Sequence, residues 1–148
     1  MTDRIEQAWA RSQGFFAEGY YCAESVLLAI AEYRGITSAV LPQIATGFCS
    51  GMADTCGTCG AVSGAIMGLG LINGVGAPGG SRAANYTAVR AFLRAFADQF
   101  GATNCLTLTG CDLGTPEGQA DFRARNVGAQ CAEFVGTATR LALELAEA

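Results

Sequence analysis

Hydrophobic residues recur at helical spacing along most of the chain. Between residues 3 and 18, Ile5, Trp9 and Phe16 lie four or seven positions apart, and charged side chains fall between them. This period is typical of a helix that packs one face against a core. On the same grounds, further helices are predicted over residues 21–33, 41–46, 59–75, 82–100 and 127–145. Thr115 and Pro116 are typical of the start of one more short helix.

The central part of the chain is almost free of charge. Between residues 35 and 81, Asp54 is the only charged residue. Gly60, Gly64 and Gly68 lie four residues apart there, so one helix face lacks side chains and lets another helix approach closely. A membrane span is the rival interpretation, but the glycine content and the helix-breaking run GVGAPGG disfavour it.

These patterns together predict an all-α fold. We expect a compact bundle of about five to seven helices around the glycine-rich central helix. The 148 residues fit one cysteine-rich helical domain, residues 1–148, because a chain of this length can bury a sizeable core. Strands are not expected, since no segment keeps the two-residue alternation of a half-buried strand for long.

Charge and composition limit the partners of the protein. All nine cationic residues are arginine, and thirteen acids leave a net charge of −4, which repels phosphate backbones and disfavours nucleic-acid binding. The first residues carry charges of both signs and no apolar run, so we expect a cytoplasmic protein without membrane insertion. Charged residues make up only 15% of the chain, which favours a surface shared with a partner, as in a homodimer.

The chemistry of the chain points to sulfur. It contains seven cysteines and no histidine. The lack of histidine excludes haem attachment motifs, Rieske centres and nucleophiles activated by imidazole. In a chain without an export signal, many cysteines favour redox or metal chemistry over a structural disulfide framework.

The cysteines fall into two groups by their sequence context. Cys22 and Cys131 lie on the apolar stripes of predicted helices, where a free cysteine is often part of the core. The other five lie in predicted loops or at helix ends, where we do not expect core packing: Cys49, Cys56, Cys59, Cys105 and Cys111. We therefore expect a functional role more strongly for these five cysteines than for Cys22 and Cys131.

Cys56 and Cys59 form a C-x-x-C motif at the predicted start of a helix. Backbone N–H groups and the helix dipole at such a position lower the pKa of a thiol. The βαβ pattern of a thioredoxin fold is missing. Cys22 and Cys131 also fall near helix starts, and Cys105 follows a helix end, so we expect Cys22, Cys59, Cys105 and Cys131 to meet at one end of the bundle.

Cys22, the run CGAVSG at residues 59–64, Cys105 and Cys131 together resemble the C_GCAxxG_C_C family of redox-active proteins, which is named for this four-cysteine signature. The run TGCDLGTPEG at residues 109–118 is similar to a cysteine-richer branch of that family. The resemblance implies that the four signature cysteines carry the redox activity. It also implies a link to transporters, and an iron-sulfur centre is associated with a similar domain of certain bacterial cytochromes.

The leading functional hypothesis is a redox protein, either an oxidoreductase or an electron-transfer protein, whose partner is a redox protein or a small thiol. Its cysteines would hold an iron-sulfur cluster or another metal, or would cycle between dithiol and disulfide. Seven cysteines exceed what a dithiol needs, which favours the cluster. The expected cofactor ligands are Cys56, Cys59 and Cys105, and Cys49 and Cys111 extend the metal-ligand set.

In the dithiol version of the leading hypothesis, Cys59 attacks and Cys56 resolves. Two other functions also remain open at the level of sequence. The alternative function is a non-enzymatic protein that binds a soft metal, zinc or copper, in association with transport. A structural protein with inert thiols is the third interpretation.

Overall fold

The structure is a computed structural model and describes residues 2–147. All its regular elements are helical, which confirms the all-α prediction, and an isolated bridge between Thr58 and Asn104 is the one β-type pairing within residues 2–147. The elements are α1 (Thr2–Glu18), α2 (Cys22–Tyr33), the 3-10 helix η1 (Gln43–Phe48), α3 (Cys49–Asp54), α4 (Gly60–Asn73), α5 (Ala83–Phe100), α6 (Cys105–Thr109), α7 (Pro116–Ala124) and α8 (Gly128–Ala146).

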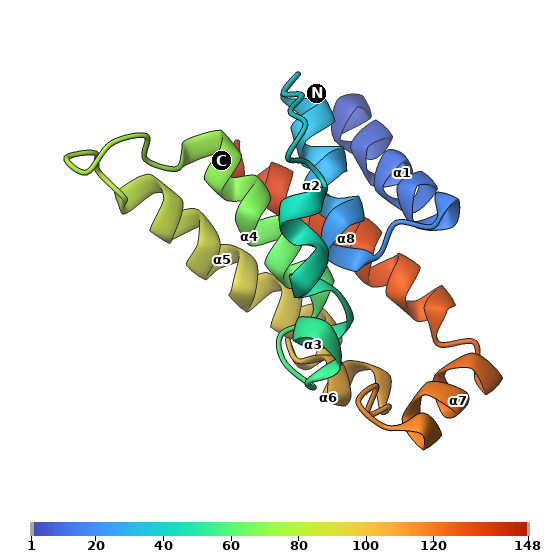
Figure 1. Cartoon of the computed structure of the whole chain (residues 1–148). Helices are drawn as coiled ribbons and strands as arrows, with labels where there is room; N and C mark the ends of the chain where they lie inside the picture. The colour runs from blue at the N-terminus through green and yellow to red at the C-terminus, as the bar shows by residue number, and fades with distance from the viewer. Residues whose placement is uncertain (1, 148) are drawn as a thin grey trace.

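The glycine-rich helix α4 lies at the centre of the bundle, as predicted. It packs on α2, α5 and α8, and α1 covers α2 and α8 (Figure 1). Val62 and Leu69 of α4 are fully buried. A β-carbon added to Gly64 would lie only 2.6 Å from the carbonyl oxygen of Ala23, so the missing side chain is what lets α2 approach.

Several helix boundaries follow the local signals in the sequence. Gly101 ends α5 in the left-handed conformation, with φ of 87°. Thr115 caps α7, and its side chain accepts a hydrogen bond from the backbone N–H of Gly118. Because Pro42 is the N-cap, the helix predicted over residues 41–46 begins later, as the 3-10 helix η1.

Two segments that the sequence pattern leaves as loops contain short helical elements instead. Asn104 caps α6 by accepting the backbone N–H of Thr107, which the apolar periodicity did not signal. α3, α6 and α7 gather at one end of the bundle, at the bottom of Figure 1. Within residues 2–147, no helix combines the length and the apolar character that a bilayer crossing requires.

The other unexpected element, α3, is a left-handed turn. Ser50, Gly51, Met52 and Ala53 have φ between 56° and 65° with positive ψ. This conformation costs roughly 1–2 kcal/mol for each residue that is not glycine. The side-chain hydroxyl of Thr55 donates to the carbonyl oxygen of Met52 at 2.8 Å, which helps to hold the turn closed. Backbone strain of this kind concentrates at functional sites, and α3 lies beside the cysteines described next.

Candidate functional site

One cavity at this end of the bundle is lined by four of the seven cysteines. It has a volume of about 400 Å³, and the thiols are those of Cys22, Cys59, Cys105 and Cys131. Each cysteine lies at or near a helix start: Cys22 begins α2, Cys59 is the N-cap of α4, Cys105 begins α6 and Cys131 lies in the first turn of α8. Four segments distant in sequence therefore deliver thiols to one place, where we expected them to meet.

Backbone pairing fixes the positions of Cys59 and Cys105. The N–H of Cys59 donates to the carbonyl oxygen of Thr103, and the N–H of Cys105 donates to that of Gly57, both at 2.8 Å. The left-handed turn closes against this pair, because a β-carbon on Gly51 would lie 2.5 Å from the β-carbon of Cys105. Only glycine fits there, so the strained turn forms a wall of the cavity.

Cys22 and Cys131 affect each other's ionisation. The side chain of Cys22 is the main cause that lowers the pKa of Cys131, although burial acts in the opposite direction. The side chain of Cys131, together with burial, raises the pKa of Cys22 well above its ordinary value. These opposite directions favour Cys131 as the thiol that ionises first, with Cys22 protonated beside it.

The other two cavity thiols are held in the protonated form. Burial raises the pKa of Cys59 to about 12, even though the backbone N–H groups of Ala61 and Val62 favour the thiolate. Burial likewise raises the pKa of Cys105, although the side chain of Thr109 acts in the opposite direction. The prediction that the helix start makes Cys59 acidic is therefore wrong, because desolvation outweighs the effect of the backbone amides.

The three cysteines outside the signature do not line this cavity. Cys56 is half-buried, and its thiol lies 3.2 Å from the carboxylate of Asp112, which raises the pKa of Cys56. Cys49 and Cys111 are 4% and 2% exposed, and Cys59 and Cys105 are 5% and 8% exposed, so the expectation that the five loop cysteines stay out of the core is wrong for all except Cys56. Loop segments that fold back onto the bundle bury them.

Cys49 and Cys111 differ in their polar surroundings. The thiol of Cys49 donates to the carbonyl oxygen of Ala45 at 3.7 Å. The sulfur of Cys111 accepts from a guanidinium nitrogen of Arg125 at 3.0 Å and lies 3.6 Å from the carboxylate of Asp121. Burial is the main cause that raises the pKa of both thiols. Neither is poised as a reactive thiolate.

The rest of the cavity wall is largely apolar. Its aromatic and aliphatic side chains are Phe16, Tyr21, Leu113, Phe122 and Phe134. Ser50, Thr109 and Gln119 add neutral polar groups, and Asp54 adds a carboxylate. Sequence reasoning noted Asp54 as the single charge in the central segment, beside the cysteine loop, but favoured a solvated loop acid. It did not place the other residues in the site.

A metal or iron-sulfur cofactor fits the chemistry of this donor set, since thiolates are the preferred ligands of both soft metals and iron-sulfur clusters. The arrangement fits less well. All seven cysteines are free thiols, and between residues 2 and 147 no three cysteine, histidine or carboxylate side chains come close enough to share one ion. The cysteines expected as ligands are spread over the cavity and over separate sites beside it, so they do not form one ligand set around a single ion.

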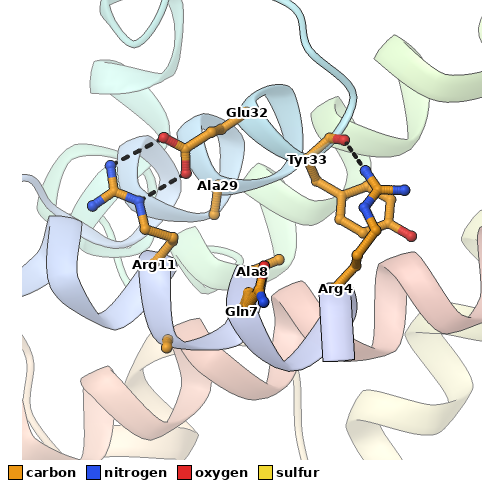
Figure 2. A pocket seen from close by; sticks show the side chains of 8 residues that line it. Arg4, Gln7, Ala8, Arg11, Ala29, Glu32 and Tyr33 are labelled. Atoms are coloured by element: carbon orange, nitrogen blue, oxygen red, sulfur yellow. Dashed lines mark hydrogen bonds and ion pairs between the residues drawn. The ribbon is translucent and has the colours of Figure 1, made fainter. Parts of the chain in front are cut away.

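A larger groove of about 650 Å³ lies between α1 and α2, and its lining contains no cysteine (Figure 2). Arg11 is paired there with Glu32 at 2.7 Å, and Arg4 donates to the carbonyl oxygen of Tyr33 at 2.8 Å. Both guanidinium groups therefore already have partners within the chain. The thiol-lined cavity, although smaller, is the better candidate site.

Comparisons with known proteins agree with the position of the thiols. No curated protein and no solved structure matches the chain significantly. A family described as "Putative redox-active protein (C_GCAxxG_C_C)" matches residues 20–145, a span that includes all four cavity cysteines. Since this match covers nearly the whole chain, the protein belongs to the C_GCAxxG_C_C family.

Proposed function

We propose that the protein is a thiol-disulfide oxidoreductase in which Cys131 attacks a disulfide and Cys22 resolves the product. The observation that carries this proposal is the placement of the Cys22 and Cys131 thiols in the lining of one cavity of about 400 Å³, where each shifts the pKa of the other in opposite directions. Thiolate character decides which thiol attacks, and the pKa of Cys131 is the one that its surroundings lower.

The exchange can be written with its atoms and electrons balanced. The thiolate of Cys131 attacks one sulfur of a disulfide RSSR, which forms a mixed disulfide and releases RS⁻. Cys22 then attacks the sulfur of Cys131, and its proton passes to the second departing thiolate. The first RS⁻ released takes a proton from water, so RSSR becomes two thiols, while the protein gains one disulfide and loses two electrons. The reverse reaction would oxidise a dithiol partner.

Serine variants test this assignment of roles. In Cys22→Ser, attack by Cys131 should proceed but resolution should fail, so a mixed disulfide accumulates on Cys131. In Cys131→Ser, rapid exchange should be lost. Mass spectrometry of tryptic peptides after brief treatment of the reduced protein with a small disulfide identifies the adducts. In the unmodified chain, it should find a disulfide between Cys22 and Cys131.

Cys56→Ser is the matched control, because Cys56 lies near the site but does not line the cavity. We expect it to exchange as the unmodified protein does. If Cys56→Ser instead traps an adduct on Cys59, the C-x-x-C pair is the redox couple and our assignment fails. It also fails if Cys131 exchanges no faster than the other thiols.

The second candidate is a metal thiolate site, either an iron-sulfur cluster or a soft metal ion bound for transport. It is supported by four thiol donors around one cavity. Elemental analysis and an ultraviolet-visible spectrum of protein purified without oxygen separate the candidates. Stoichiometric iron and sulfide with a brown colour would favour the cluster, and a colourless, metal-loaded protein would favour the soft metal. Metal-free protein that exchanges disulfides supports the dithiol couple.

A further inference from the structure

The wall of the thiol cavity carries a charge of one sign. Asp54 is the one residue among its lining residues that is charged at neutral pH. A neighbouring cavity of about 270 Å³ shares Tyr21, Ser50 and Asp54 with it and adds Glu24. No lysine or arginine lines either cavity. An incoming molecule therefore meets carboxylates without a compensating cation.

A third carboxylate lies beside Asp54. A β-carbon on Gly114 would be 2.7 Å from the backbone oxygen of Asp54 and 3.1 Å from a carboxylate oxygen of Asp112, so these two acidic residues flank the same glycine. The guanidinium of Arg125, which contacts Cys111, is already held by Asp121 at 2.8 Å. Its charge is thus largely neutralised within its own pair.

The position of Asp54 brings its charge close to the reacting groups. It ends the left-handed turn with φ of 66°, and this turn closes against Cys105. The negative charge of Asp54 contributes to the raised pKa of Cys105, after burial and other neighbouring groups. A field that acts on a cavity thiol also acts on a molecule inside the cavity.

We propose that this cavity selects small disulfides without negative charge, and that it prefers those with cationic ends on short hydrocarbon arms. The inference rests on the proposed thiol-disulfide exchange and names the substrate class of that site. The carboxylate of Asp54 attracts a cationic end, and the apolar wall formed by Phe16, Phe122 and Phe134 receives the hydrocarbon. A disulfide with carboxylate ends is repelled by Asp54 and finds no cation in the wall.

Three disulfides of similar length test the proposal: cystamine, which carries two ammonium groups, bis(2-hydroxyethyl) disulfide, which is neutral, and 3,3′-dithiodipropionate, which carries two carboxylates. The rate at which each disulfide reacts with the reduced protein is divided by the rate at which the same disulfide reacts with N-acetylcysteine amide, a neutral free thiol. This division removes differences in intrinsic reactivity between the three disulfides. We expect the order cystamine, neutral disulfide, dithiodipropionate, with about tenfold between the first and the last at low salt. The ratio should shrink as ionic strength rises.

Asp54→Asn removes the charge at constant size, and asparagine tolerates the left-handed conformation of this position. In this variant, the normalised ratio of the cystamine rate to the dithiodipropionate rate should be roughly threefold smaller than in the unmodified protein. Glu144→Gln is the matched control, since this exposed residue lies thirteen positions after Cys131 along α8, about 20 Å away. It should keep the preference.

The outcomes separate this inference from the function on which it rests. If no disulfide reacts faster with the unmodified protein than with Cys131→Ser, the thiol-disulfide function fails. If exchange occurs at Cys131 but dithiodipropionate reacts as fast as cystamine after normalisation, the function stands and the charge selectivity is overturned. An unchanged ratio in Asp54→Asn would likewise overturn the role of this carboxylate.

Discussion

The close approach of α2 and α4 can be tested by adding a single methyl group. In Gly64→Ala, the new β-carbon would lie 2.6 Å from the carbonyl oxygen of Ala23, 3.0 Å from its α-carbon and 3.1 Å from the β-carbon of Val26. Two of these atoms belong to the backbone and the third to a branched side chain, so no flexible group can move aside. The two helices must therefore separate.

The expected cost follows from two opposing effects. Overpacking of a tightly packed core typically costs about 1–3 kcal/mol, and the contact with backbone atoms places this site towards the upper end. Alanine stabilises a helix by about 1 kcal/mol relative to glycine. We therefore expect Gly64→Ala to lower the free energy of unfolding by about 2 kcal/mol, which corresponds to a fall of roughly 4–8 °C in melting temperature.

Gly70→Ala is the control in the same helix. Gly70 is exposed, and a β-carbon there would meet nothing within 4 Å, so only the helix propensity changes. This variant should gain about 0.5–1 kcal/mol. Urea denaturation followed by circular dichroism at 222 nm measures both. If Gly64→Ala is as stable as Gly70→Ala, the proposed role of this glycine in helix approach is refuted.

Three further predictions concern the turn and the thiols. Ala53→Gly should relieve left-handed strain and raise the free energy of unfolding by about 1 kcal/mol. Ala10→Gly, in the middle of α1, should lower this free energy by a similar amount, and urea denaturation of both variants measures whether the two changes have opposite signs. At pH 8, iodoacetamide should modify Cys131 before Cys59, because the pKa of Cys131 is lowered and that of Cys59 is about 12; peptide mass spectrometry that finds the reverse order contradicts this. Since the unfolded Cys59 thiol ionises near pH 8.5 and the folded one near 12, the stability contributed by its burial is complete below pH 8.5 and is lost as the pH rises towards 12. Between pH 8.5 and pH 12, the free energy of unfolding of Cys59→Ser should therefore fall less steeply than that of the unmodified protein, as measured by urea denaturation at several pH values.

Our proposal of a dithiol couple, rather than a cluster, changes the interpretation of the extra cysteines. A count of seven favoured a metal site, because a dithiol needs only two sulfur atoms. In the folded chain, Cys49, Cys56 and Cys111 each have separate polar neighbours, and four other thiols share the cavity. The number of cysteines is thus a weaker guide to their chemistry than the places to which they fold.

The sequence by itself was sufficient for the helical framework. Apolar residues at a period near 3.6 mark α1, α2, α5 and α8, and the cap signals at Thr115 and Gly101 mark the ends of helices, because these features depend on residues a few positions apart. The glycines of α4 predicted close helix packing for the same local reason. The four-cysteine signature identified the family and the residues that meet.

Only the tertiary structure decided the state of each thiol. The local argument made Cys59 acidic, but burial by segments remote in sequence raises its pKa. The pKa of Cys131 is lowered instead, because the side chain of Cys22, more than a hundred residues away, acts on it. The left-handed turn is likewise invisible to periodicity, since contact with Cys105 selects a conformation that its own residues disfavour. Desolvation and packing depend on neighbours that the fold assembles, whereas helix formation depends mainly on neighbours along the chain.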